Sequence, residues 1–121
     1  MRVLSEVVIT NPRGWAVDTY VIIFLLELKK AVASKQFAVI PREKNNAFLA
    51  RCGMTPAERE ELVAGLTSHD YMSGPEYDRD YPKEQDIWKF KKRFGRREIY
   101  IKLKLVTKGN GYYAKCLSFH D

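Results

Sequence analysis

A histidine stands second from the end of the sequence, in the segment CLSFHD, and it is one of only two histidines in the chain. Imidazole titrates closest to neutral pH of all side chains, so His120 could serve as a general acid or a general base. It closes a segment in which apolar and polar residues alternate, a pattern typical of a β-strand. If this strand pairs with the alternating segment EIYIKLKLV, then Tyr100 and Lys102 lie on the same sheet face as His120.

The apolar residues of these two segments indicate how they pair, because a shift of one residue would move every side chain to the other face. A three-residue loop at residues 109–111 keeps apolar residues opposite apolar ones, and its glycines suit a left-handed loop position. A two-residue loop at Asn110–Gly111 would instead oppose Tyr100 to Asp121 and mix apolar with polar residues. The sequence therefore predicts the three-residue loop. The opposed pairs are then Lys108 with Tyr112, Leu103 with Leu117, Lys102 with Ser118, Ile101 with Phe119 and Tyr100 with His120.

Such a face could cleave an RNA phosphodiester without a metal ion. The 2′-hydroxyl attacks phosphorus when a base removes its proton, an acid protonates the departing 5′-oxygen, and cations stabilise the transition state. His120 is the candidate general acid or base, and Tyr100 could donate a proton or bind a phosphate oxygen. Lys89 and Lys102 are candidate phosphate stabilisers. Further candidate phosphate ligands are Arg93, Arg96 and Arg97, and candidates for stacking on bases are Trp88, Phe94, Tyr112 and Tyr113.

The charge distribution supports contact with a polyanion and leaves the chemistry open. The formal net charge is +6, and ten basic residues against a single acid, Glu98, lie between Trp88 and Lys115. Such a concentration of positive charge is typical of nucleic-acid binding, but it also suits an acidic partner protein. Alternating tyrosine and lysine residues are also common on solvated strands. From the residues alone, a non-catalytic module that binds RNA or a protein remains an alternative to an enzyme.

The elements that would position these residues include two clear helices. The first begins at Asp18 or Thr19 and carries an apolar stripe at helical spacing. The second follows Thr55, which is predicted to cap the helix together with Glu58, with Pro56 at the first helical position. Between them we expect a short strand over Phe37–Ile40 and a helical turn in NNAFLARCG. The stripe of the first helix consists of Val21, Phe24, Leu25, Leu28, Ala31 and Val32.

The second half of the chain begins with a polar, turn-rich segment over Ser68–Asp86, which we expect to be a long loop that brings Tyr71 near the site. The alternating segments beyond it predict a strand meander. The sequence thus predicts an α+β fold, with a small antiparallel sheet packed on one face by two or three helices. We expect residues 18–121 to form one domain and residues 1–17 to form an N-terminal arm.

Composition excludes several classes of protein. With 45% hydrophobic and 30% charged residues, the chain has the composition of a soluble globular protein. The most apolar segment, Tyr20–Leu28, is too short for a membrane span, which needs about 20 apolar residues. Cys52 and Cys116 lack metal-ligand spacing, so we expect no metal site and no cofactor. Two free thiols without a secretion signal favour the cytoplasm.

Four segments, GLTSHDY, DIWKFKK, REIYIKLKL and AKCLSFH, resemble the MqsR-type toxins of bacterial toxin–antitoxin pairs. The segments have the order and spacing of that family, and the resemblance covers the chain from about Val21 to His120. It implies a RelE-like fold and a metal-independent endoribonuclease that cleaves single-stranded mRNA. It also implies a cognate antitoxin as the protein partner.

The resemblance also implies roles for individual residues. The polar active-site residue that follows IW is Lys89 here, and the tyrosine of the Y-[IL]-K strand is Tyr100. The residue after the terminal SF is commonly a lysine in the family, and in this chain it is His120. A family lysine of the long loop falls on Ser73, so either the cation comes from elsewhere, such as Lys91 or Lys92, or the activity is weakened. The predicted RNA-binding residues are Tyr71, Ser73, Lys91, Arg93, Arg96, Arg97, Lys102 and Lys104.

Overall fold

The computed structural model describes residues 9–10, 16–17 and 19–121. Strands β1 (Ile9–Thr10) and β2 (Ala16–Val17) pair antiparallel in a small sheet of their own. The rest of the predicted arm over residues 1–17 lies outside the described residues. The remaining elements are α1 (Thr19–Ala33), β3 (Phe37–Val39), α2 (Glu43–Cys52), α3 (Pro56–Ala64), β4 (Tyr71–Glu76), β5 (Ile87–Phe94), β6 (Arg97–Lys108) and β7 (Gly111–His120).

Five strands form the main sheet, in the order β3-β7-β6-β5-β4. Strands β5 to β7 pair antiparallel, as predicted, and β4 adds antiparallel to β5. Strand β3, however, runs parallel to β7, with Phe37 opposite Ala114 and Val39 opposite Cys116. The α+β class is therefore confirmed, whereas the prediction of a purely antiparallel sheet is wrong. The physical reason is the connection that follows β3: two helices and three strands intervene before β7, so no hairpin constrains the direction of the pairing.

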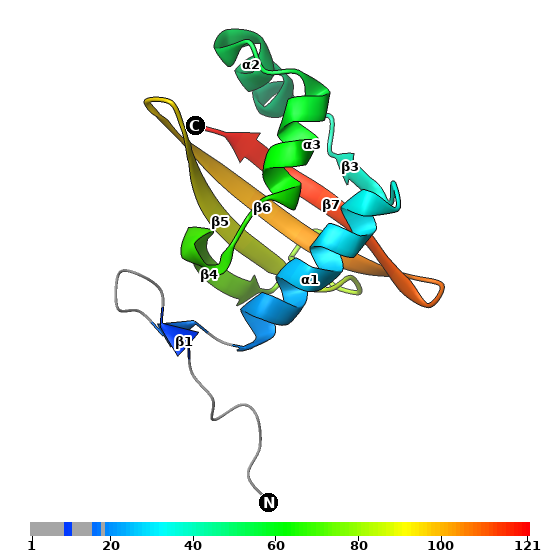
Figure 1. The fold of residues 1–121 in the computed structure, drawn as a ribbon. Coiled ribbons are helices and arrows are strands. Elements are labelled where there is room, and N and C mark those ends of the chain that lie inside the picture. Colours follow the sequence, from blue (N-terminus) through cyan, green and yellow to red (C-terminus); the bar gives the residue numbers. More distant parts are fainter. Residues whose placement is uncertain (1–8, 11–15, 18) are drawn as a thin grey trace, which may run out of the picture.

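Helices α1 and α3 lie across one face of the sheet, and α2 lies beside the end of β7 (Figure 1). All six residues of the predicted apolar stripe of α1 are buried. The predicted cap of α3 is confirmed, because the Thr55 side chain accepts a hydrogen bond from the Glu58 amide and the Glu58 carboxylate accepts one from the Thr55 amide. Lys29 of α1 donates to the carbonyls of Ala64 and Leu66 and so ties α1 to the end of α3. None of the described helices is long and apolar enough to cross a membrane.

The segment predicted as one long loop contains a strand. A 3₁₀ turn over Ser68–Asp70 leads into β4, which pairs with β5 along an edge of the sheet. Gly74 and Pro75 are residue types that disfavour a strand, so the sequence did not indicate one here. Gly74 has φ 120°, and a Cβ there would come within 2.9 Å of the Ile87 carbonyl oxygen, so this position of β4 requires glycine.

The last hairpin differs from the prediction at two points that compensate for each other. The turn consists of Gly109 and Asn110, with Lys108 opposite Gly111, so the predicted three-residue loop is wrong. A register shift then makes Leu117 an extra residue of β7, and Leu103 faces Cys116 instead of Leu117. Beyond this bulge the predicted register is confirmed. The confirmed pairs are Lys102 with Ser118, Ile101 with Phe119 and Tyr100 with His120.

Candidate functional site

Two rows of polar side chains cross the sheet on the face that α1 and α3 leave free, here called the open face. In one row Ser73, Lys89, Lys102 and Ser118 stand opposite one another on β4, β5, β6 and β7. In the other row Lys91, Tyr100 and His120 stand opposite one another on β5, β6 and β7. Directly opposed side chains lie on the same face of a sheet. The fold therefore gathers most of the residues that the sequence singled out.

A pocket of about 380 Å³, here called the phosphate pocket, lies at the β7 end of these rows. Tyr100, Lys102, Ser118 and His120 line it from the sheet, and Arg42–Asn45 at the start of α2 line its other wall. This volume is in the range of sites that bind small molecules. Sequence reasoning predicted the sheet side of the pocket but missed the α2 side, because no local pattern connects α2 with β7.

Asn45 of α2 explains why the end of β7 is ordered. The side chain is 1% exposed; it accepts a hydrogen bond from the Phe119 amide at 2.9 Å and donates to the Leu117 carbonyl at 3.2 Å. It thus continues the hydrogen bonding of β7 beyond the point where β3 ends. Arg51 and Arg97 bind the two carboxylate oxygens of Asp121 at 2.6 and 3.0 Å. The end of β7, which carries His120, is therefore held by Asn45 and, through Asp121, by the two arginines.

The two candidate proton-transfer groups are accessible from the pocket. His120 is half-buried, and its Nδ1 lies 3.1 Å from the Asp121 backbone oxygen, which can accept a hydrogen bond from that nitrogen. Tyr100 is 43% exposed, and the Lys91 ammonium lies 6.0 Å from the centre of its ring. An imidazole and a phenol thus lie on adjacent strands, and both line the same pocket.

The cations around this pocket differ in their partners. Arg42, Lys44 and Lys102 are exposed, and none of them forms an ion pair with any residue that the structure describes. Lys89 pairs with Glu76 at 2.9 Å, and Lys91 lies 3.8 Å from Glu98. The free positive charge of the site therefore lies on both sides of the phosphate pocket, where an anion would meet the least competition.

Lys104 is the clearest correction among the predicted RNA-binding residues. Its side chain is fully buried and donates to Asp78 and, at 3.0 Å, to Glu84. Burial is the largest single influence on the pKa of Lys104 and lowers it, but the hydrogen bonds to Asp78 and Glu84 and their negative charges together raise it overall. An ammonium buried in this way between two carboxylates is not available to RNA.

Tyr71 also lies away from the predicted site. Its ring packs against Trp88 and Phe90, and its hydroxyl donates to the Gly74 carbonyl at 2.7 Å. Trp88 itself stacks on Phe24 of α1, so both aromatic rings belong to the face that the helices cover. Neither ring can stack on a base at the phosphate pocket.

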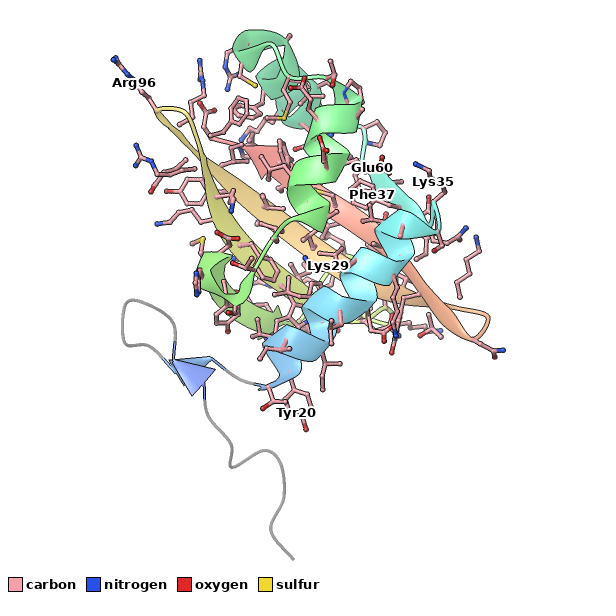
Figure 2. All side chains as sticks on the ribbon, viewed as in Figure 1. Tyr20, Lys29, Lys35, Phe37, Glu60 and Arg96 are labelled. Atoms are coloured by element: carbon pink, nitrogen blue, oxygen red, sulfur yellow. The ribbon has the colours of Figure 1, made fainter. Side chains whose placement is uncertain are left out.

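The predicted arginines cluster near the turn between β5 and β6. Arg97 is bound to Asp121, while Arg93 and Arg96 are exposed. Figure 2 shows Arg96 at the tip of this turn, with its side chain directed away from the sheet. Arg93 and Arg96 lie beyond the lining of the phosphate pocket, so they could contact only a ligand that extends past it.

The remaining candidates for chemistry are few. Burial raises the pKa of the Cys116 thiol to about 12, consistent with an unreactive core residue. In the part of the chain that the structure describes, no three His, Cys, Asp or Glu side chains lie close enough together to hold a metal ion.

Comparison with known proteins adds no relative: the chain matches no family model, no curated protein and no solved structure.

Proposed function

We propose that the protein is an endoribonuclease of the MqsR toxin type, with a RelE-like fold, that cleaves single-stranded mRNA in the cytoplasm. The reaction would use the 2′-hydroxyl of the RNA as the nucleophile and require no metal ion or cofactor. A cognate antitoxin protein would hold the enzyme inactive. The proposal is supported by the resemblance of four sequence segments to that family and by the side chains that converge on the phosphate pocket.

One observation carries the proposal. His120 and Tyr100 stand opposite each other at the end of the sheet, in a pocket of about 380 Å³ whose cations Arg42, Lys44 and Lys102 have no ion-pair partner among the described residues. A scissile phosphate in this pocket would meet positive charge on two sides and a proton-transfer group on the sheet. Such preorganised charge stabilises a developing phosphorane without a reorganisation cost.

The chemistry assigns a role to each group. His120 transfers a proton to or from the reacting oxygens, since imidazole can serve as both acid and base near neutral pH. Tyr100 donates a proton or a hydrogen bond to a phosphate oxygen. Lys102 stabilises the negative charge directly, and Lys89, which stands opposite Lys102, adds to the positive potential once Glu76 releases it.

The alternative is a non-catalytic module whose open face binds RNA or an acidic partner protein. It uses the same cations but does not need His120 and Tyr100 to lie together. The two functions can therefore be distinguished by one product, because only the endoribonuclease generates new RNA ends.

The test is to incubate the purified protein with a long single-stranded RNA in EDTA and to map any new ends. We expect cleavage, a loss of about 10²–10⁴-fold in rate for His120→Ala, and a smaller loss for Tyr100→Phe. His69→Ala and Tyr20→Phe are matched controls, because both residues are exposed and lie outside the pocket. RNA binding without new ends would refute the enzyme and support the alternative.

A further inference from the structure

The phosphate pocket is one of two neighbouring compartments. A second pocket of about 470 Å³ is lined by Glu43, Lys44, Ala47, Arg51, His120 and Asp121. The two pockets share three lining residues, namely Glu43, Lys44 and His120. They therefore adjoin each other between α2 and the end of the sheet, with His120 common to both compartments, and are together called the groove here.

The two compartments differ in charge. The phosphate pocket has three basic side chains, Arg42, Lys44 and Lys102, against one carboxylate, Glu43. In the second pocket two basic side chains, Lys44 and Arg51, are balanced by Glu43 and Asp121. Arg51 and Asp121 also neutralise each other directly, at 2.6 Å. A phosphate is thus favoured in the first compartment and meets no net positive charge in the second.

A hydroxyl that opens into the first compartment without a partner among the described residues points independently to a ligand there. Ser118 is only 8% exposed, yet it lines the phosphate pocket, and its hydroxyl forms no hydrogen bond with the described part of the chain. A phosphate oxygen in this pocket would accept a hydrogen bond from the Ser118 hydroxyl.

We propose that the groove divides an RNA strand at His120: the phosphate binds between α2 and the sheet, to Arg42, Lys44, Lys102 and Ser118, and the adjoining base binds beside Arg51, Glu43 and Asp121. The inference rests on the proposed function for its substrate class. In the second compartment the carboxylates can accept hydrogen bonds from base amino groups, and Arg51 can donate to base carbonyl and ring-nitrogen acceptors. The second compartment is thus suited to reading a base, and α2 becomes a specificity element of the enzyme.

The experiment measures binding of short 2′-O-methyl oligoribonucleotides, which lack the nucleophile and cannot be cleaved. Arg42→Gln is expected to weaken binding roughly fivefold for every base composition, as loss of one solvent-accessible charge contact would. It should also flatten the plot of log binding constant against log salt concentration by about 0.7. Lys30→Gln is the matched control, because it removes one exposed positive charge from α1, in the opposite layer of the fold.

Arg51→Gln is expected to behave differently. It should leave the salt dependence unchanged and alter the order of affinities for the A, C, G and U homopolymers. Arg97 still holds Asp121 in this variant, so the end of β7 keeps one of its two anchors. An Arg42→Gln protein indistinguishable from Lys30→Gln would overturn the inference, as would an Arg51→Gln protein with the homopolymer preferences of the wild type.

These outcomes are separable from those of the proposed function. If the predicted binding behaviour appears but unmodified RNA is never cleaved, the endoribonuclease proposal fails and the division of the groove stands. If RNA is cleaved through His120 but Arg42→Gln and Arg51→Gln have no effect, the division of the groove fails and the enzyme stands.

Discussion

Lys102 and Lys104 lie two residues apart on β6 and point to the same face of the sheet, but their surroundings are opposite. Lys102 is exposed in the phosphate pocket, without an ion pair to any described residue, whereas Lys104 is completely buried between Asp78 and Glu84. The difference is made by residues 77–86, here called the acidic loop. This loop brings carboxylates onto one end of the open face and leaves the other end, near His120, uncovered.

The acidic loop holds two lysines at once. Glu84 binds Lys104 through one oxygen at 3.0 Å and Lys115 through the other at 2.9 Å. The Tyr81 ring lies over both ammonium groups, 5.4 and 5.8 Å from its centre. Basic residues with the same alternation thus serve two purposes: internal pairing at one end of β6 and, in our proposal, phosphate binding at the other. The comparison teaches that a basic strand is a ligand surface only where no acidic segment of the same chain covers it.

The largest effect that the comparison predicts is on stability. Lys104→Ala leaves Asp78 and Glu84 facing a cavity, and removing one partner of a buried ion pair costs about 3–5 kcal/mol. Lys102→Ala, on the same strand and face, should change the free energy of unfolding by less than about 0.5 kcal/mol, as exposed substitutions usually do. Urea unfolding followed by circular dichroism measures both values.

RNA binding should show the reverse order. Lys102→Ala is expected to weaken it, whereas Lys115→Ala, whose ammonium is occupied by Glu84, should have little effect. Equal losses of stability for the two β6 variants would contradict the structural contrast, whatever the RNA measurements show.

A second, smaller effect concerns the contacts that hold the end of β7 near His120, which the acidic loop does not cover. Asn45→Ala removes the partners of the Phe119 amide and the Leu117 carbonyl, both in a buried region, so we expect a loss of about 2 kcal/mol in the free energy of unfolding. The rung of His120 should also fray, which would appear as faster hydrogen exchange at the Phe119 amide. The adjacent Asn46 is exposed, so Asn46→Ala is the matched control. If the Phe119 amide exchanges at the wild-type rate in Asn45→Ala, β7 is held by something other than α2.

Local signals in the sequence predicted local structure well. The cap of α3 depends only on Thr55, Pro56 and Glu58, and the structure has it as predicted. The pairing of Tyr100 with His120 was also predicted correctly, but for a reason that was only partly right. Alternation of apolar residues requires a compatible register near the core. The shorter turn, combined with the bulge at Leu117, pairs Tyr100 with His120 just as the predicted longer turn would.

Contacts between distant segments could not be predicted in the same way. Whether Lys102 or Lys104 is buried depends on where residues 77–86 pack, and nothing in the alternation of β6 reports that. The parallel pairing of β3 and the position of Asn45 beside Phe119 join residues more than 70 positions apart. Half of the phosphate pocket was missed for this reason, because nothing in the local sequence of Arg42–Asn45 indicates that these residues face the end of β7.

The smallest predicted effect is the pH dependence of the free energy of unfolding that comes from Asp78, at the end of the open face that the acidic loop covers. The hydrogen bond from Lys104 is the main cause that lowers the pKa of Asp78, with burial opposing it and the amides of Asp80 and Tyr81 adding to it. A carboxyl group whose pKa is lower in the folded than in the unfolded chain stabilises the fold at pH values above its ordinary pKa of about 4. This stabilisation is lost as the pH falls through the folded pKa.

Asp78→Asn should therefore be less stable than wild type at pH 6, and the difference should shrink toward pH 3. Urea midpoints at the two pH values measure this, and Asp86→Asn, which changes an exposed acid at the end of the acidic loop that forms no ion pair with any described residue, should show no such convergence. A difference between Asp78→Asn and wild type that stays constant with pH would mean that the carboxylate charge does not hold the acidic loop on Lys104, and the contrast between the two ends of β6 would then depend on packing alone.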